Sequence, residues 1–159
     1  MATINREITV NSYVGTVFDF LLKPGNLLRV WPSLVDIESE NALPGGGYSF
    51  SWQYRMGGIL LTGTGKHTDV ALNNWIVAET TGAVVCKITF AFRNDGIHTR
   101  LFMTISYKIP IPVLGRLAEN TIIKMNEGEV DLILVNIEQL LENEAEQSRE
   151  THYSVIRAL

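Results

Sequence analysis

A long amphipathic helix near the C-terminus, placed after a series of strands, constrains the fold of this chain most strongly. The segment Tyr107-Lys-Ile-Pro-Ile-Pro-Val-Leu-Gly115 contains two prolines, which suit the approach to a helix and not its interior. The helix is expected to start near Val113 and to run for about thirty residues, roughly 45–50 Å at ~1.5 Å per residue. Its apolar stripe consists of Leu114, Leu117, Ala118, Ile122, Met125, Ile133, Ile137, Leu140 and Leu141. Such a helix is expected to lie across the concave face of a sheet and to leave an internal space.

The composition indicates one globular domain and argues against several classes of function. Of the 159 residues, 46% are hydrophobic and 19% are charged, a balance typical of a folded soluble protein. The formal net charge of -4 gives no electrostatic basis for nucleic-acid binding. No run reaches the ~18 apolar residues needed to span a bilayer, and the N-terminal segment lacks the apolar core of a signal peptide. We therefore expect a cytoplasmic protein without integral membrane association.

Neither the cysteine nor the histidines point to a metal centre or a cofactor. Cys86 is the only cysteine, which excludes an intramolecular disulfide and a cysteine-based structural zinc site. Its apolar surroundings in the sequence indicate a small core residue and not a reactive thiol. The histidines at positions 67, 98 and 152 lack the spacing of metal ligands. We expect no metal and no cofactor.

Residues 1–47 predict a strand, two short helices and a second strand. The first strand ends at the helix-cap signal Asn11-Ser12. Apolar residues then follow at helical spacing over residues 14–22. A second short helix is expected over residues 26–31, because a proline stops it there. The next strand leads into a glycine-rich loop at residues 44–47.

Residues 48–67 carry the clearest strand pattern in the chain. Apolar side chains, most of them aromatic, alternate with polar ones over residues 48–56, which is a period of two. Gly57-Gly58 predicts a two-residue hairpin loop that fixes the register of the next strand. The predicted pairs are Met56–Ile59, Tyr54–Leu61, Trp52–Gly63, Phe50–Gly65 and Tyr48–His67. Two glycines therefore lie opposite two large aromatic rings, which can rest on the bare backbone.

A second hairpin is predicted over residues 84–107, with its loop at Asp95-Gly96. The predicted pairs are Phe92–Thr99, Phe90–Leu101, Ile88–Met103, Cys86–Ile105 and Val84–Tyr107. All ten residues share one face. Nine of them are apolar, aromatic or cysteine, so this face is expected to point inward.

The strand between the two hairpins, residues 75–81, has no unique orientation in the sequence. If the preceding hairpin sets the alternation, through a two-residue Asn73-Asn74 loop, then Ile76, Ala78 and Thr80 point inward. If the following hairpin sets it, through a Gly82-Ala83 loop, then the odd-numbered residues point inward, Glu79 among them. A difference of one residue in either turn swaps the two faces, so one turn must hold an odd residue. The orientation of Glu79 stays open.

The order of elements and several local motifs resemble a known fold family. The motifs are Ser12-Tyr-Val-Gly-Thr-Val-Phe-Asp-Phe-Leu21, residues 28–32, the Asp95-Gly96 turn with Thr99-Arg100, and residues 107–114. Over residues 3–145 the chain resembles the START/Bet v 1-like (SRPBCC) superfamily, specifically its polyketide cyclase/dehydrase and coenzyme Q-binding-like branch. The resemblance implies a helix-grip α+β fold, with two short helices after the first strand and a curved antiparallel sheet of about seven strands around a long C-terminal helix. We expect a single domain over residues 1–147 and a polar C-terminal tail over residues 148–159.

The resemblance also implies a class of function. Members of this superfamily mostly bind lipids, sterols, quinones, polyketides or plant hormones between sheet and helix, and a minority are enzymes. The residues expected to contact such a ligand are Phe50, Trp52, Tyr54, Gly63, Gly65, His67, Phe90, Met103, Tyr107 and Met125. The alternative is that these side chains simply fill the core. Two inward glycines, a glycine at position 128 in mid-helix and several tyrosine hydroxyls favour a cavity.

His67 and Glu79 are the candidate titrating residues. An inward His67 beside Tyr48 could orient a ligand carbonyl or act as a general acid or base. The alternative is a strand-end histidine that lies partly in solvent. Glu79 could serve as a base if it faced the cavity, and it is otherwise an ordinary exposed glutamate.

The leading hypothesis is a protein that binds a hydrophobic small molecule such as a lipid, quinone or polyketide. Four residues (Trp52, Tyr54, Phe90 and Met103) would give apolar contact, while Tyr107 and His67 would orient a polar end. Replacing Gly63 or Gly65 by Leu is expected to abolish ligand uptake and to preserve the fold. One alternative is a polyketide cyclase/dehydrase-like enzyme that uses His67, with Glu79 as a second candidate, for acid/base chemistry. Another is an assembly partner of a quinone-dependent complex.

Overall fold

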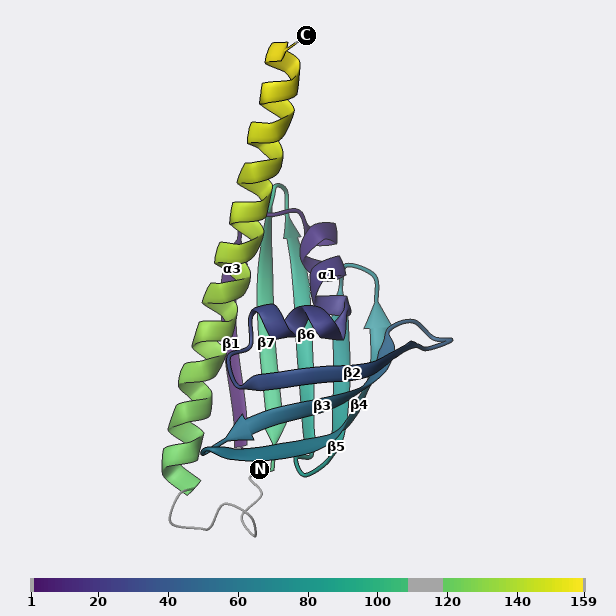
Figure 1. The fold of residues 1–159 in the computed structure, drawn as a ribbon, viewed down its shortest axis with the longest axis vertical. Coiled ribbons are helices and arrows are strands. Elements are labelled where there is room, and N and C mark those ends of the chain that lie inside the picture. The colour runs from purple at the N-terminus through teal and green to yellow at the C-terminus, as the bar shows by residue number, and fades with distance from the viewer. Residues whose placement is uncertain (1, 109–118, 159) are drawn as a thin grey trace.

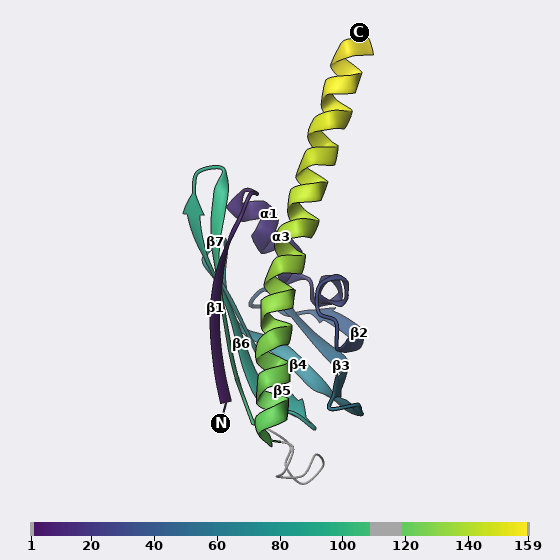
Figure 2. The ribbon, with the colours of Figure 1, turned by 90° about the vertical axis from the view of Figure 1, so that its left-hand side faces the viewer.

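The computed structural model describes residues 2–108 and 119–158. These residues form a seven-stranded antiparallel sheet, two short helices and one long helix (Figure 1). The strands are β1 (Ala2–Val10), β2 (Leu34–Ala42), β3 (Tyr48–Met56), β4 (Ile59–Ala71), β5 (Trp75–Gly82), β6 (Cys86–Asp95) and β7 (His98–Tyr107). The helices are α1 (Val14–Leu22), the 3-10 helix η1 (Pro24–Arg29) and α3 (Glu119–Ala158). Figure 2 shows the sheet curving around α3, which is the helix-grip α+β architecture that the sequence predicts.

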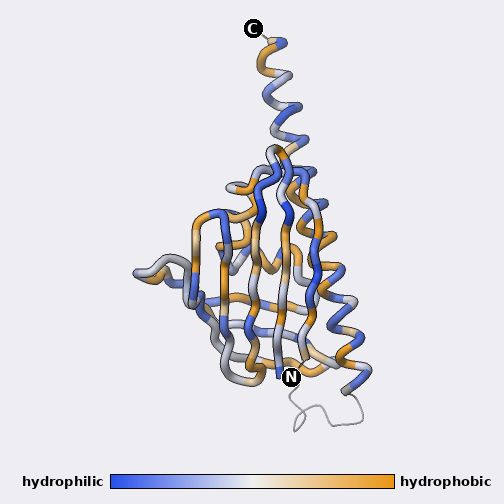
Figure 3. Tube along the Cα trace, turned by 180° about the vertical axis from the view of Figure 1, so that it is seen from behind, coloured by the Kyte–Doolittle hydropathy of each residue, from blue (hydrophilic) through white to orange (hydrophobic). Residues whose placement is uncertain are grey.

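The strand order in the sheet is β1-β7-β6-β5-β4-β3-β2. Successive strands from β2 to β7 are therefore neighbours, and β1 is added beside the last of them. The antiparallel β1–β7 pairing runs from Ala2↔Tyr107 to Val10↔Thr99. Apolar and polar positions alternate along several strands (Figure 3), so one face packs inward and the other meets solvent.

The register of the β3–β4 hairpin agrees with the prediction. The pairs Met56↔Ile59, Tyr54↔Leu61, Trp52↔Gly63 and Phe50↔Gly65 are all present. Both loop glycines, Gly57 and Gly58, have left-handed φ angles of 57° and 82°. Positive φ at both central positions is the requirement of a type I′ turn, which matches the twist of the flanking strands.

The register of the β6–β7 hairpin differs from the prediction by two residues. Phe90 pairs with Met103, Ile88 with Ile105 and Cys86 with Tyr107, so Gly96 and Ile97 form the loop in place of Asp95-Gly96. Gly96 has a φ of 71° and occupies the first central position, where a two-residue loop with one left-handed residue needs glycine. Because the shift is an even number of residues, the inward face remains as predicted.

The open orientation of β5 is decided by an irregularity in β4. The β4–β5 register shifts between His67 and Asp69, and a three-residue turn follows Ala71. Each of these two features adds one residue to the path from β4 to β5, so their effects on the orientation of β5 cancel. Ile76, Ala78 and Thr80 are therefore buried on the inward face. The extra residue that the sequence requires in one of the two turns lies in the connection from β5 to β6, which is longer than the predicted two-residue loop. Glu79 is exposed on the outer face, paired across the strands with Lys66 and Lys87.

Helix α1 spans Val14–Leu22 as predicted, but its cap and the start of η1 differ from the prediction. The N-cap of α1 is Tyr13 and makes no side-chain capping bond, so the expected Asn11-Ser12 cap is wrong. Ser12 is instead buried, and its carbonyl oxygen accepts a hydrogen bond of 2.8 Å from Thr99 Oγ1. Helix η1 begins at Pro24, two residues before the predicted start, because proline suits the first turn of a helix.

Helix α3 is longer than predicted. Its 40 residues correspond to about 60 Å at ~1.5 Å per residue. The predicted start at Val113 and the stripe residues 114, 117 and 118 lie outside the described residues. Its buried apolar side chains are Ile122, Val130, Ile133, Leu134, Ile137 and Leu141. Residues 148–158, expected to form a polar tail, continue the helix with exposed side chains and project beyond the sheet (Figure 1).

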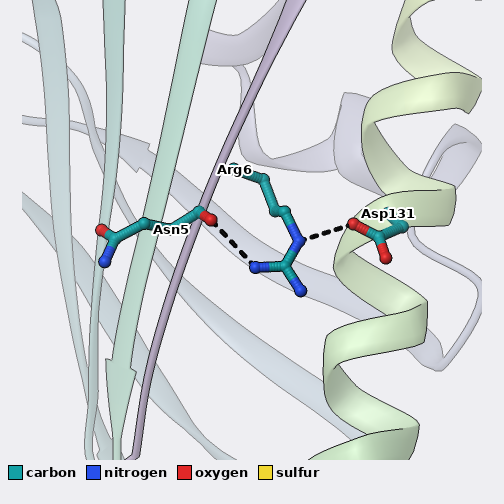
Figure 4. A network of polar contacts seen from close by, with 3 residues as sticks. All are labelled: Asn5, Arg6 and Asp131. Atoms are coloured by element: carbon teal, nitrogen blue, oxygen red, sulfur yellow. Dashed lines mark hydrogen bonds and ion pairs between the residues drawn. The ribbon is translucent and has the colours of Figure 1, made fainter.

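Polar contacts at its margins attach α3 to the rest of the fold. On one side, Arg6 of β1 donates a hydrogen bond from Nε to Asp131 Oδ1 at 2.8 Å (Figure 4). Arg6 also donates from Nη1 to the carbonyl oxygen of Asn5. On the other side, Asn136 donates to the carbonyl oxygen of Val30 at 3.0 Å. No helix among the described residues has the length and apolar character needed to cross a membrane.

Candidate functional site

A pocket lies between the concave face of the sheet and α3, with a volume of about 120 Å³. This volume is well above the roughly 10–15 Å³ that one water molecule needs. Most of its wall is apolar and comes from inward strand positions, with Val84 of the β5–β6 connection. These residues are Ile37, Phe50, Trp52, Met56, Ile76, Ala78, Val84, Ile88, Phe90 and Ile105. Pro24 and Leu27 of η1, with Trp31 just beyond it, close part of the wall.

Gly63 and Gly65 form the backbone on which two aromatic rings rest. A Cβ atom on Gly65 would lie 2.7 Å from the Phe50 ring. A Cβ atom on Gly63 would lie 2.4 Å from the Trp52 ring and 2.1 Å from the carbonyl oxygen of Thr81. The rings of Phe50 and Trp52 line the pocket, whereas the glycines do not. The expectation that Leu at position 63 preserves the fold is therefore wrong, because backbone atoms block the side chain.

The main polar group on the helix side of the pocket is the carboxylate of Glu129. Its Oε1 accepts hydrogen bonds from the backbone N–H of Ser33 and from the Tyr54 hydroxyl, each at 3.2 Å. Its Oε2 accepts a hydrogen bond from the Ser33 hydroxyl. Helix α3, the η1–β2 connection and β3 thus meet at this carboxylate. The negative charge is held inside a largely apolar pocket by three donors, as a part-buried carboxylate requires.

Tyr54 and Trp31 complete this end of the pocket. Their rings meet edge to face, with centroids 6.4 Å apart and an interplanar angle of 88°. Burial raises the pKa of Tyr54 strongly, and the nearby charge of Glu129 raises it further. The Trp31 N–H lies close enough to the hydroxyl to oppose this rise in pKa. No hydrogen bond of acceptable geometry joins the two groups, however, and Trp31 Nε1 is buried without a partner among the described residues. Because burial and the charge of Glu129 both raise the pKa of Tyr54, its hydroxyl stays protonated at neutral pH.

A second polar contact joins the helix to the sheet one turn earlier. Asn126 Nδ2 donates a hydrogen bond of 2.9 Å to the Tyr107 hydroxyl, and both residues line the pocket. Burial raises the pKa of Tyr107, so its hydroxyl is protonated at neutral pH. Because Asn126 and Glu129 are three residues apart, they lie on the same side of α3.

His67 lies toward the other end of β3 from Tyr54. Its Nδ1 accepts a hydrogen bond of 2.9 Å from the backbone N–H of Tyr48, which assigns the ring proton of the neutral form to Nε2. Burial lowers the pKa of His67, although the charge of Glu40 opposes this effect. Gly47 has a φ of 76°, and a Cβ atom there would lie 2.6 Å from the imidazole. The glycine-rich loop therefore packs directly on His67.

The predicted site residues divide into two groups. Phe50, Trp52, Tyr54, His67, Phe90 and Tyr107 line the pocket. Met103 is completely buried behind it, on the inward face of β7. Met125 is 54% exposed and Gly128 has open space around it, so neither faces the pocket as expected. Glu79 lies on the outer face of the sheet and takes no part in the pocket wall.

Cys86 lines the pocket, and burial raises its pKa to about 11. A thiol with this pKa is protonated at neutral pH and is a poor nucleophile. Within residues 2–108 and 119–158, no three His, Cys, Asp or Glu side chains are grouped so that they could hold a metal ion.

The sequence of the chain matches a family model described as polyketide cyclase / dehydrase and lipid transport, over residues 1–142. The chain belongs to this polyketide cyclase/dehydrase and lipid transport family. The match spans every described strand and the part of α3 that covers the sheet. No curated protein matches the chain in sequence.

Solved structures with the same fold fit this family assignment. A Thermus thermophilus protein, TTHA0849, superposes with a TM-score of 0.77 at 17% identity, covering 90% of this chain and 99% of its own. The Zhui aromatase/cyclase of a Streptomyces species (strain R1128) has a TM-score of 0.68 at 16% identity, covering 92% and 94%. A START superfamily protein of Mycobacterium smegmatis has a TM-score of 0.67 at 13% identity, covering 89% and 97%. At these identities the likeness concerns the fold.

Sequence reasoning missed four residues that form the polar end and helix side of the pocket in this family member: Trp31, Ser33, Asn126 and Glu129. For the helix residues a signal existed. Asn126 lies four residues after buried Ile122 and seven before buried Ile133, in phase with the buried stripe. Placing Met125 on the stripe moved the predicted inward face by one position. No local signal marks Ser33, whose partner lies 96 residues away.

Proposed function

We propose that this protein binds a hydrophobic small molecule of the lipid, quinone or polyketide kind in the pocket between the sheet and α3. The observation that carries the proposal is the pocket itself, whose apolar wall is interrupted by a few polar groups. Sites for hydrophobic ligands combine these two features, because apolar contact supplies affinity and sparse polar groups fix orientation.

The distribution of the polar groups supports an oriented ligand. Glu129 and Tyr54 lie at one end of β3, and His67 lies opposite the start of the same strand. Tyr54 is six positions after Tyr48 on β3, about 20 Å along the strand at ~3.3 Å per residue. An elongated ligand could therefore meet a polar group at each end and apolar side chains between them.

The family description and one neighbour agree with this class of ligand. The family is described by polyketide cyclisation or dehydration and by lipid transport, and the Streptomyces neighbour is named an aromatase/cyclase. We do not extend the proposal to catalysis. Glu79 is outside the pocket, and His67 Nδ1 already accepts a hydrogen bond from the backbone.

The proposal is tested by filling the pocket from the sheet side. Ala78 is buried on β5 and lines the pocket, so Ala78→Leu places three additional carbon atoms inside it. Ala91 lies on the opposite face of the neighbouring strand, and Ala91→Leu is the matched control. Naphthalene is the probe, with affinity measured by equilibrium dialysis and folding checked by circular dichroism.

We expect the unmodified protein to bind naphthalene, Ala78→Leu to weaken binding at least about tenfold, and Ala91→Leu to bind like the unmodified protein. Equal binding by the two folded variants would place the probe elsewhere and would remove the pocket from the proposal. Absence of binding by the unmodified protein would contradict a general apolar site.

A further inference from the structure

One end of the pocket carries an unused hydrogen-bond acceptor. The two oxygens of a carboxylate offer about four acceptor positions in total. In Glu129, three donors occupy these positions: the backbone N–H of Ser33, the Ser33 hydroxyl and the Tyr54 hydroxyl. About one position is therefore left for a further donor, at a residue that lines the pocket.

The same end carries an unused donor. Trp31 Nε1 is buried and has no hydrogen-bond partner of acceptable geometry in the described part of the protein, although its N–H lies near the Tyr54 hydroxyl. The edge-to-face contact with Tyr54 holds this indole beside the Tyr54–Glu129 hydrogen bond. A buried N–H without an acceptor is costly, so native proteins rarely keep one unless the group has a role.

We propose that this end of the pocket recognises a hydroxyl group of the ligand, which accepts a hydrogen bond from Trp31 Nε1–H and donates one to Glu129. The inference rests on the proposed function, because it assigns the ligand's polar group within the same pocket. It narrows the ligand to a hydrophobic alcohol or phenol.

Other polar groups fit this pair less well. A ketone or ether oxygen can accept from Trp31 but has no hydrogen for Glu129. An ammonium group can donate to Glu129 but leaves the indole N–H unpaired. A carboxylate would be placed beside the negative charge of Glu129. Of these groups, only a hydroxyl supplies both the acceptor and the donor, and it does so on a single atom. A site that offers both a buried donor and a buried acceptor discriminates strongly against ligands that leave them unpaired.

Three naphthalene compounds of the same ring system test this assignment by isothermal titration calorimetry. Naphthalene has no polar group, 2-methoxynaphthalene has an acceptor only, and 2-naphthol has an acceptor and a donor. We expect the unmodified protein to bind 2-naphthol about tenfold more tightly than 2-methoxynaphthalene, with naphthalene the weakest.

Two conservative variants test the acceptor, Glu129, and the donor, Trp31, separately. In Glu129→Gln the ratio of the dissociation constants of 2-methoxynaphthalene and 2-naphthol is expected to fall toward one. In Trp31→Phe the ratio for naphthalene and 2-methoxynaphthalene is expected to fall toward one, because the ring remains and the N–H is lost. Glu138→Gln makes the same exchange elsewhere on α3, at a residue outside the pocket wall, and is expected to change neither ratio. Thermal melting confirms that each variant is folded.

The outcomes separate this inference from the proposed function. If the unmodified protein binds all three compounds with equal affinity, the pocket binds apolar molecules and the hydroxyl assignment is wrong. The same conclusion follows if both ratios persist in folded Glu129→Gln and Trp31→Phe. If the unmodified protein binds none of the three, the proposed function fails and the hydroxyl assignment fails with it.

Discussion

Across the pocket, the sheet presents mainly apolar side chains, whereas helix α3 presents Asn126 and Glu129 beside a single apolar residue, Val130. On the sheet, alternation with a period of two sends every second residue inward, so a strand rich in apolar residues gives an apolar wall. On the helix, successive residues turn by about 100°, and residues at the border of the stripe also reach the pocket.

The difference shows how a polar group can be placed in an apolar pocket when a hydrogen-bond partner offsets the free energy of its desolvation. Each of the two helix residues finds a partner on the sheet: Asn126 bonds to the Tyr107 hydroxyl, and Glu129 accepts a bond from the Tyr54 hydroxyl. The two tyrosines have apolar rings with a hydroxyl at the tip. Their rings therefore form part of the apolar sheet wall, and their hydroxyls form hydrogen bonds with the two helix residues. The sheet supplies most of the apolar wall of the pocket, and the helix adds Asn126 and Glu129 to its polar groups.

The largest contrast between the sheet and the helix is expected at Gly63 and Gly128, one closely packed and the other in open space. Gly63→Ala places a methyl group 2.1 Å from the Thr81 carbonyl oxygen and 2.4 Å from the Trp52 ring, so β4 and β5 must separate. We expect a loss of about 3 kcal/mol in the free energy of unfolding. Gly128→Ala on the helix meets no atom within 4 Å and is expected to stabilise by about 0.5–1 kcal/mol. Urea denaturation compares them, and a similar effect at both positions would contradict the close packing of β4 on β5.

A second contrast lies within the helix itself. Ile137 is fully buried and Met125 is 54% exposed, although the sequence places both on the apolar stripe. We expect Ile137→Ala to cost about 2–5 kcal/mol and Met125→Ala to stay within about 0.5 kcal/mol. Thermal and urea denaturation measure both. A large loss in Met125→Ala would support the helix orientation that the sequence predicts and would move Glu129 away from the pocket.

The smallest expected effect concerns the pH dependence of stability at His67. Burial lowers the pKa of His67 below its ordinary value of 6.5, so the folded protein takes up this proton at lower pH than the unfolded chain does. Below pH 6.5 the unfolded chain therefore binds more protons, and this residue makes stability fall as the pH falls through that window. Well above pH 6.5 both states are neutral and the effect vanishes.

His67→Asn retains a side-chain acceptor and removes the titration. We expect urea denaturation of this variant to show a weaker loss of stability between neutral and mildly acidic pH than the unmodified protein shows. An unchanged pH profile would mean that His67 is not desolvated in the folded state. Glu79, on the outer face of the sheet, offers the control: Glu79→Gln is not expected to reproduce the change.

The predictability of the strands depended on their turns. The register of β3–β4 followed from Gly57-Gly58, because two glycines admit a type I′ turn with both residues left-handed. In β6–β7 the sequence Asn94-Asp95-Gly96 allowed two alignments, and the structure uses Gly96 as the first loop residue instead of the second. The orientation of β5 depended on the irregularity beside His67, which no pattern of residues signals.

The candidate site was predicted in the same uneven way. Its apolar wall followed from strand alternation, and six of the ten predicted ligand contacts line the pocket. At the polar end, Tyr54 was predicted but its partners Ser33 and Glu129 were missed, because they come from segments far apart in the chain. Ser33 and Glu129 are separated by 96 residues, and Tyr54 and Glu129 by 75.

The sequence alone determined the inward face of two hairpins, since this follows from local periodicity and turn chemistry. The fold class and the family followed from the resemblance of its motifs to a known superfamily. Only the tertiary structure decided which side of β5 is buried, which side of α3 faces the pocket, and which polar groups meet there. A strand or helix pattern specifies what an element can bury, whereas its exact rotation and partners depend on packing against distant parts of the chain. For this reason the apolar wall of the pocket was predictable, and the hydrogen bonds around Glu129 were not.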